Sequence, residues 1–129
     1  MADVNRGNRP LSPFMIGQYY RPQLTSMSSI MVRLSGLAVL ALAPLVVWWL
    51  LAAATSASAF AAIDGFLRSW FGDLILFGAT WALCYHTLGR LRHVIWDFGY
   101  CLDVPTSEKM GIGMFAGATV LTLLIVLVV

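Results

Sequence analysis

The stretch LSGLAVLALAPLVVWWLLAAA, residues 34–54, carries no charged side chain and is long enough to cross a membrane as a helix. Such a helix needs roughly 20 consecutive apolar residues. Two further runs without charge follow, at residues 74–89 and 110–129. The run at 74–89 is short, but it reaches membrane length if the helix continues through polar residues as far as Asp97. The pattern predicts an all-α membrane protein with three transmembrane helices, at about 28–54, 72–98 and 108–129.

The composition of the chain agrees with this prediction. Of its 129 residues, 60% are hydrophobic and 11% are charged, whereas a soluble domain usually carries about 25% charged residues. The length suits a single membrane-anchor domain, residues 1–129. Residues 1–26 contain arginines and prolines but no apolar run, so we expect an extended N-terminal arm and no signal peptide. The formal net charge of +2 gives no indication of nucleic-acid binding.

The basic residues are distributed unequally between the segments that flank the apolar runs. Four arginines precede residue 34 and three basic residues lie between 90 and 109, whereas the connection at 55–72 has Arg68 alone. Because basic residues accumulate on the cytoplasmic side of membrane proteins, we expect the N-terminus and the 93–109 connection on that side. The 55–72 connection is expected to hold a short amphipathic helix at the membrane interface, with an apolar side formed by Phe66, Leu67, Trp70 and Phe71.

The stretch HTLGRLRHVIWD, residues 86–97, concentrates polar groups in the second predicted helix and contains both histidines of the chain. At about 100° per residue, one face of a helix carries His86, Arg90, His93 and Asp97. A histidine inside a membrane span is a candidate functional residue, and imidazole is a common ligand of haem iron. His86 is therefore either a haem ligand or a hydrogen-bonded interior histidine. Arg92 is expected to act mainly as a charge that sets topology.

The spacing of the two histidines limits what they can bind. His86 and His93 are seven residues apart and point the same way, so they cannot take opposite faces of one haem. Because the chain has no third histidine, a haem with two histidine ligands requires the second from a partner subunit or a symmetry mate. His93, nearer the interface, is expected to make a polar contact more readily than to ligate a metal.

A second polar group lies at the start of the first predicted helix, in SSIMVRLSG at residues 28–36. Ser29 and Arg33 are four residues apart and share a helix face. A hydroxyl and a guanidinium together can donate to a carbonyl oxygen, as a quinone head group requires. The alternative is a helix-capping serine and an arginine that sets topology. Residues 25–29 supply cap candidates for this helix, Thr106 or Ser107 for the third, and Gly113 with Gly117 has the spacing of close helix packing.

The two polar stretches together resemble one known family. RPLSPFMIGQYYRPQLTSMSSIMVRLSG, residues 9–36, is similar to the N-terminal signature RPLSPH…Y…SI.HR.(T/S)G of the cytochrome b subunit of succinate dehydrogenase. HTLGRLRHVIWDFGY, residues 86–100, is similar to that family's second signature, H…GIRH..WD.G. The two matches occur in order, at the expected places in a chain with three predicted helices.

The resemblance implies a membrane anchor of succinate:quinone oxidoreductase, which docks a flavoprotein and an iron–sulfur subunit and is not catalytic toward succinate alone. It implies haem b shared with a second membrane-anchor subunit, with His86 as one axial ligand. It also implies quinone as substrate, in a pocket that includes Ser29, Arg33 and Asp97. Arg33 and His93 would lie near the haem propionates. The membrane would be the bacterial cytoplasmic membrane, in preference to the mitochondrial inner membrane.

The chain departs from the family pattern at three points. Val32 stands where the family usually has histidine before the signature arginine, and Phe14 replaces the histidine of RPLSPH. The glycine of GIRH is displaced, because this chain has Gly89 followed by Arg90 and Leu91, which makes that helix face more basic. Two rival interpretations remain open at this point: a haem-free tether or assembly subunit of a redox complex, and a small transporter subunit that uses the polar face as an ion path.

Overall fold

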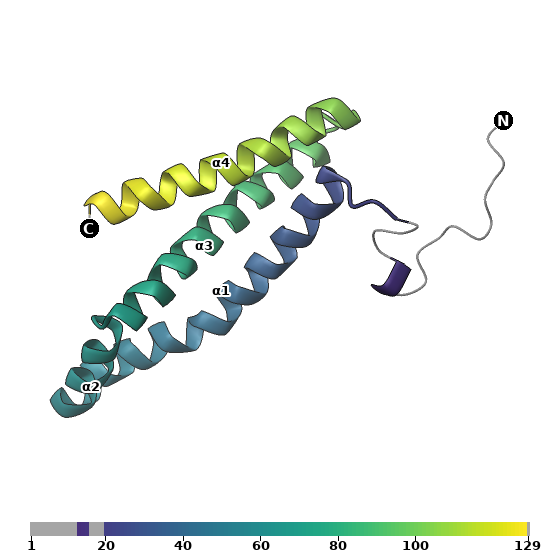
Figure 1. The fold of residues 1–129 in the computed structure, drawn as a ribbon. Helices are drawn as coiled ribbons and strands as arrows, with labels where there is room; N and C mark the ends of the chain where they lie inside the picture. Colours follow the sequence, from purple (N-terminus) through teal and green to yellow (C-terminus); the bar gives the residue numbers. More distant parts are fainter. Residues whose placement is uncertain (1–12, 16–19, 129) are drawn as a thin grey trace, which may run out of the picture.

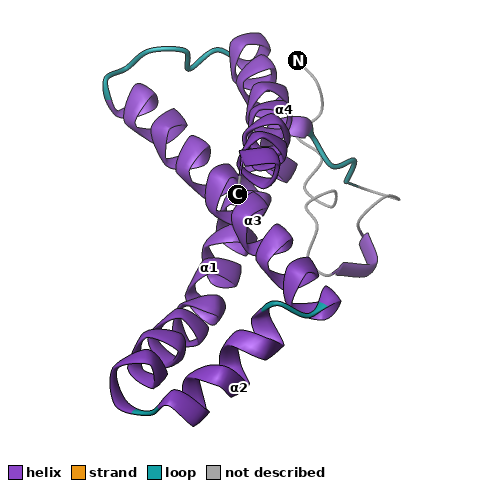
Figure 2. Cartoon of the chain, turned by 90° about the vertical axis from the view of Figure 1, so that its left-hand side faces the viewer, coloured by secondary structure: helices purple, strands orange, loops and turns teal. Residues whose placement is uncertain are grey.

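The computed structural model describes residues 13–15 and 20–128, and within them the chain is built of helices (Figures 1 and 2). A short 3-10 helix, η1 (Pro13–Met15), precedes four α-helices: α1 (Leu24–Thr55), α2 (Ala57–Leu67), α3 (Trp70–Asp97) and α4 (Val104–Val128). The prediction of an all-α protein is confirmed. Most of the predicted N-terminal arm, with Arg6 and Arg9, lies outside the described residues, and Phe14 is exposed in η1.

The helix ends are capped by residues other than those predicted. α1 begins at Leu24, after Gln23, which makes no side-chain capping bond. The prediction that residues 25–29 cap this helix is wrong, because these residues lie within its first two turns, and the Ser28 hydroxyl donates to the Thr25 oxygen. At α4 the predicted caps Thr106 and Ser107 are also wrong, because the Asp103 carboxylate accepts from the backbone N–H of Thr106 at 3.0 Å. Hydrogen bonds from Thr106 lower the pKa of the Asp103 carboxyl, so it remains ionised and suited to this role.

The connection between α1 and α3 contains a short helix, as predicted, but this helix ends before Trp70 and Phe71. α2 covers Ala57–Leu67, and Trp70 and Phe71 open α3 instead of extending α2. Ser69 separates the two helices because its hydroxyl accepts from the backbone N–H of Gly72 at 3.2 Å, which is an N-cap bond. The position of α2 at a membrane interface stays a prediction.

α3 lies between α1 and α4 and packs against both, as Figure 1 shows. The core cluster that joins the three helices consists of Val32, Tyr85, Met114 and Ala118. It lies toward the end of the molecule where α1 begins, α3 ends and α4 begins. At the other end α4 diverges from α1 (Figure 1). The three helices are therefore held together mainly at the end that carries the polar residues of α3.

Two glycines allow this close packing. Gly89 is buried on α3, and a Cβ added there would overlap the Val32 side chain of α1. Gly111 is buried on α4, and an added Cβ would lie 3.3 Å from the Ser28 hydroxyl oxygen. Of the predicted pair, a Cβ added at Gly117 would lie 3.1 Å from Leu88 Cδ1, whereas one added at Gly113 would have no atom within 4 Å. The close approach of α4 to α1 therefore depends on Gly111, two residues before the predicted pair.

Alanine at Gly89 is expected to destabilise the bundle by about 1–3 kcal/mol, the usual cost of overpacking a core. The added methyl group would overlap Val32, whose β-branched side chain has little freedom to move. Alanine at Gly78 on the same helix is the control, because an added Cβ there has no atom within 4 Å. Thermal unfolding of the purified complex measures both, and equal melting temperatures for the two variants would contradict the packing described here.

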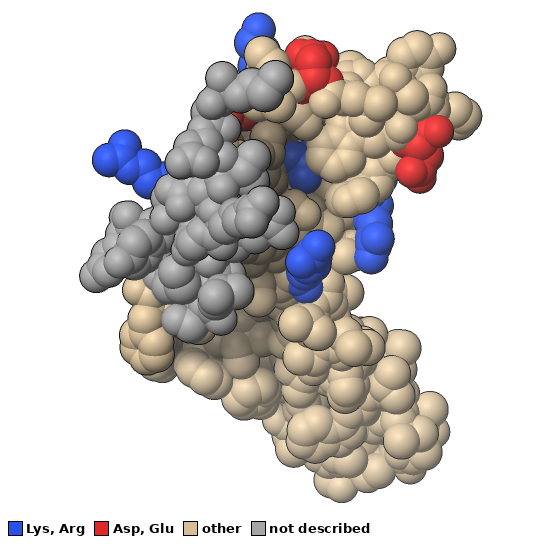
Figure 3. Space-filling model, turned by 90° about the vertical axis from the view of Figure 1, so that its right-hand side faces the viewer, with Lys and Arg blue, Asp and Glu red and all other residues tan. Residues whose placement is uncertain are grey.

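The outer surfaces of the helices are strongly apolar. By length and composition α1 and α4 qualify as membrane spans, and many of their large apolar side chains are exposed. α3 does not qualify on the same criteria, because His86 and its arginines lower its hydropathy, so a third span stays a prediction. On the face drawn in Figure 3, charged side chains of the described residues gather toward the end where α3 meets α4, and the opposite half shows none.

Candidate functional site

His86 lies half-buried between α3 and α1, and its ring is held in one tautomer. The Nδ1 atom is 3.0 Å from the backbone oxygen of Val32 and 3.4 Å from the Ser35 hydroxyl. Because a carbonyl oxygen only accepts, Nδ1 carries the proton and Nε2 keeps a free lone pair. The Arg90 Nε–H donates to that lone pair at 3.2 Å. The structure thus brings His86 and Arg90 together, as the helical spacing predicted.

Gly36 makes room for the imidazole of His86. A Cβ added to Gly36 would lie 2.7 Å from the ring atom Cε1 and 3.0 Å from Nδ1. Real side chains essentially never approach so closely, so only glycine leaves the ring in this position. Ser35, one residue before, is buried and donates to the same Val32 oxygen at 2.9 Å. Gly36 therefore fixes the position of the imidazole ring, and the backbone oxygen of Val32 fixes its orientation.

The other predicted site residues lie around the same end of the bundle but make fewer contacts. His93 is half-buried, its Nδ1–H donates to the Gly89 oxygen at 2.7 Å, and its ring meets Trp96 edge-on with 5.3 Å between centroids. Ser29 is half-buried, and Arg33 and Asp97 are exposed. Within the described residues no side-chain hydrogen bond joins Ser29 to Arg33 or to Asp97. The structure thus places Ser29 and Arg33 in the first part of α1 and His93 and Asp97 in the last part of α3, with no hydrogen bond between the two pairs among the described residues.

A buried polar cluster on another face of α3, about 100° around the helix from His86, was missed by the sequence reasoning. The Arg92 Nη1–H donates to the Ser28 hydroxyl at 2.9 Å, and the guanidinium stacks over the Trp96 ring, with 4.4 Å from Cζ to the ring centroid. The Tyr85 hydroxyl donates to the backbone oxygen of Ser28 at 3.0 Å. The expectation that Arg92 mainly sets topology is wrong, because its side chain is 1% exposed. The sequence did contain one indication of this cluster, because Tyr85 and Arg92 are seven residues apart and therefore lie on one face of α3.

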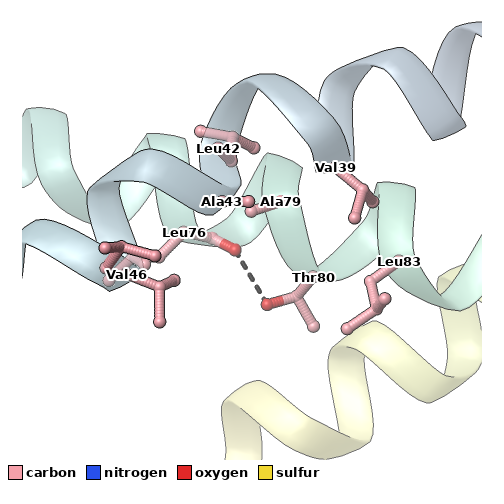
Figure 4. A pocket seen from close by; sticks show the side chains of 9 residues that line it. Val39, Leu42, Ala43, Val46, Leu76, Ala79, Thr80 and Leu83 are labelled. Carbon is pink, nitrogen blue, oxygen red and sulfur yellow. Dashed lines mark hydrogen bonds between the residues drawn. The ribbon is translucent and has the colours of Figure 1, made fainter. Parts of the chain in front are cut away.

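An apolar groove of about 430 Å³ continues the seam between α1 and α3 beyond His86 (Figure 4). The groove begins with Val39 and Leu83, each three residues from Gly36 or His86 along its own helix. Its one polar lining residue, Thr80, already donates its hydroxyl to the Leu76 oxygen at 2.8 Å. The groove therefore offers contacts to an apolar occupant, such as a helix or a hydrocarbon chain.

The donor set fits a haem axial ligand. A ligating histidine usually donates its other ring N–H to a carbonyl or carboxylate, which fixes the tautomer and orients the ring. His86 has this arrangement, with Nδ1–H on Val32, Nε2 free of any proton, and glycine beneath the ring. Within the described residues no group of three or more histidine, cysteine or acidic side chains converges on a point that could hold a metal ion. The orientation of the His86 ring therefore suits a ligand whose Nε2 lone pair binds a metal.

The fold and the site together define a helical membrane subunit with a histidine held between two of its helices. Residues 5–125 match the model of the succinate dehydrogenase/fumarate reductase transmembrane subunit family. The chain belongs to this family.

Relatives of known identity agree with the family model. The chain is 49% identical over 128 residues to the succinate dehydrogenase cytochrome b556 subunit of Paracoccus denitrificans, covering 99% of this chain and 97% of that protein. It is 35% identical over 122 residues to the cytochrome b560 subunit of Marchantia polymorpha, covering 91% of this chain and 88% of that protein. It is 28% identical over 120 residues to the cytochrome b556 subunit of Rickettsia typhi, covering 91% and 90%.

Proposed function

We propose that this chain is the cytochrome b membrane-anchor subunit of a succinate:quinone oxidoreductase. The observation that carries the proposal is the oriented imidazole of His86, with Nδ1–H on Val32 and Gly36 beneath it, in a chain of this family. The subunit is not catalytic toward succinate by itself. It anchors the flavoprotein and iron–sulfur subunits to the membrane and contributes residues to the haem and quinone sites.

In this function His86 would hold haem b through its Nε2 atom. When bound, the haem supplies one-electron storage close to the quinone. A second membrane-anchor subunit would contribute the other histidine, because His93 lies on the same face of α3 as His86 and the chain has no third histidine. That subunit covers the apolar groove beside α1 and α3. Arg90, which contacts Nε2 in this structure, moves aside when the ligand position is taken.

Quinone, the substrate, binds at the end of the bundle where α1 begins. The Ser29 hydroxyl and the Arg33 guanidinium donate to a quinone carbonyl oxygen and stabilise the negative charge that develops on it during reduction. The Asp97 carboxylate, exposed at the end of α3, passes protons from water to the reduced ring. Arg33 and His93 would also hold the haem propionates.

The charged end of the bundle faces the dehydrogenase head. The described basic residues near this end, the 98–103 connection and the N-terminal arm then lie on the cytoplasmic side, as the positive-inside rule expects. α1, α3 and α4 are the three membrane spans, and α3 tolerates its polar residues because they face protein and cofactor instead of lipid. The membrane is the bacterial cytoplasmic membrane, which the identity to the Paracoccus denitrificans protein favours over a mitochondrial one.

Alanine at Arg33 is expected to lower quinone reduction by succinate on the order of 100-fold, the usual loss when a donor to a developing oxyanion is removed. Succinate oxidation with an artificial dye, which takes electrons from the head, is expected to remain within about two-fold of wild type. Steady-state assays of both activities on the purified complex measure the difference. Lysine at Arg33 should recover part of the rate, because it keeps the charge but loses the planar fork.

Alanine at Arg68 is the matched control for this test. Arg68 is an exposed arginine at the far end of the bundle, where its Nε–H donates to Asp64 at 2.8 Å. Its loss should leave both activities unchanged. Wild-type quinone reduction in the Arg33→Ala complex would exclude Arg33 from the pocket, and an equal loss of dye activity would indicate that the head had detached.

A further inference from the structure

We propose that Tyr85 and Arg92 of α3 hold Ser28 of α1 and thereby position Ser29 and Arg33 for quinone. We call Ser28, Tyr85 and Arg92 the Ser28 clamp. The inference rests on the proposed function, since it assumes that Ser29 and Arg33 meet quinone. It assigns Tyr85 and Arg92 as positioning residues that need not touch the substrate.

The clamp grips Ser28 at two different atoms. Arg92 donates to its hydroxyl oxygen at 2.9 Å, and Tyr85 donates to its backbone oxygen at 3.0 Å. The Ser28 hydroxyl in turn donates to the Thr25 oxygen, so the serine rotamer is fixed as well. Bonds to a side chain and to the main chain of one residue restrain both the rotation of α1 about its axis and its movement along that axis.

The three clamp residues are enclosed by protein. Ser28 and Tyr85 have no exposed surface, and Arg92 is 1% exposed. Gly111 of α4 lies against the site, where a Cβ added to it would lie 3.3 Å from the Ser28 hydroxyl oxygen and 3.4 Å from Ser28 Cβ. Trp96 stacks on the guanidinium. Buried hydrogen bonds of this kind do not exchange with water, so the clamp holds α1 in one orientation.

By holding Ser28, the clamp also fixes the position of Ser29 in the proposed quinone pocket, because the two serines are neighbours on one helix. Ser28, Val32 and Ser35 form the face of α1 that turns toward the bundle, and all three are buried. Ser29 and Arg33 lie about 100° around the helix from that face. A rotation of α1 would therefore move both groups sideways relative to a bound ring. Misplacement by about 1 Å can lower a rate on the order of 100-fold.

The free-energy cost of burying Arg92 supports a role for it beyond packing. Within the described residues, Nε and Nη2 of Arg92 are buried and have no hydrogen-bond partner. A buried cation with unused donors is expensive, and leucine of similar size would pack there without that cost. What arginine adds over leucine is a directed bond to Ser28 and a cation–π contact with Trp96.

Three variants test the clamp in the complete complex: Tyr85→Phe, Ser28→Ala and Arg92→Lys. Each removes or weakens a bond of the clamp, and Ser28→Ala also removes the bond to the Thr25 oxygen. The Michaelis constant for quinone is expected to rise about three- to ten-fold in each, the size of one lost hydrogen bond. The dye-linked succinate activity and the haem spectrum should stay at wild-type values. The double variant Ser28→Ala/Arg92→Lys should be no worse than the worse single variant, because both changes act on one bond.

Tyr100→Phe and Thr87→Val are the matched controls. Tyr100 is exposed after α3, and Thr87 is exposed on α3 with its hydroxyl bonded within its own helix. Both should bind quinone normally. A wild-type Michaelis constant in Tyr85→Phe and Ser28→Ala would overturn the clamp even if these variants melted at lower temperature, and Tyr85→Phe is mild enough to assemble. If Arg33→Ala also reduced quinone normally, the proposed quinone pocket would be wrong as well. If the clamp variants had wild-type Michaelis constants but Arg33→Ala lost quinone reduction, only the clamp would be excluded and the proposed pocket would stand.

Discussion

Alanine at His86 is expected to abolish the b-type haem signal of the purified complex. The Nε2 atom of His86 is the proposed axial ligand, and alanine at that position has no atom that could bind iron. Partial retention of haem by the partner's histidine alone would give a five-coordinate spectrum shifted from the wild-type one. A dithionite-reduced minus oxidised absorbance spectrum of the complex, in mild detergent, measures the change.

His93→Ala is the comparison variant for this experiment. His93 is the other histidine of the chain and lies on the same face of α3, but its Nδ1–H is bonded to Gly89 and it is not the proposed ligand. Its loss should keep the six-coordinate spectrum. A normal spectrum in the His86→Ala complex would remove His86 as ligand and make it a packing residue. No haem in the wild-type complex would favour the haem-free tether.

Alanine at Gly36 is expected to weaken haem binding on the order of 10-fold or more, although residue 36 would not touch the iron. The added Cβ would lie 2.7 Å from Cε1 of His86. The ring must then move and lose its bond to the Val32 oxygen, and such outer contacts of a metal ligand contribute about 10- to 100-fold in affinity. Haem content per complex, measured by pyridine haemochrome absorbance during dilution or mild heating, reports the loss.

Gly113→Ala is the control for the Gly36 variant. It introduces the same methyl group into a helix of the same bundle, at a position where an added Cβ has no atom within 4 Å. Haem content should be unchanged there. Wild-type haem retention in the Gly36→Ala complex would mean that the His86 imidazole can bind haem from a second position. Haem binding would then not depend on the ring position described here.

The sequence alone determined the class of the protein and the residues that share the polar face of α3. Long runs without charge predict membrane helices because each unpaired charge in lipid is costly. The pairing of His86 with Arg90 also follows from sequence, because residues four apart in a helix are neighbours whatever surrounds them. Family membership follows from motifs whose residues lie in order along the chain.

Only the tertiary structure decided which polar residues are buried and what they bind. Ser28 and Ser29 are adjacent in sequence, yet the first is enclosed by three helices and the second lies at the edge. Arg92 was expected to act mainly as a charge that sets topology and is instead buried against Ser28 and Trp96. In a soluble helix an apolar stripe marks the buried face. A membrane helix is apolar toward both lipid and protein, so that stripe is absent, and inter-helix packing alone selects the buried face.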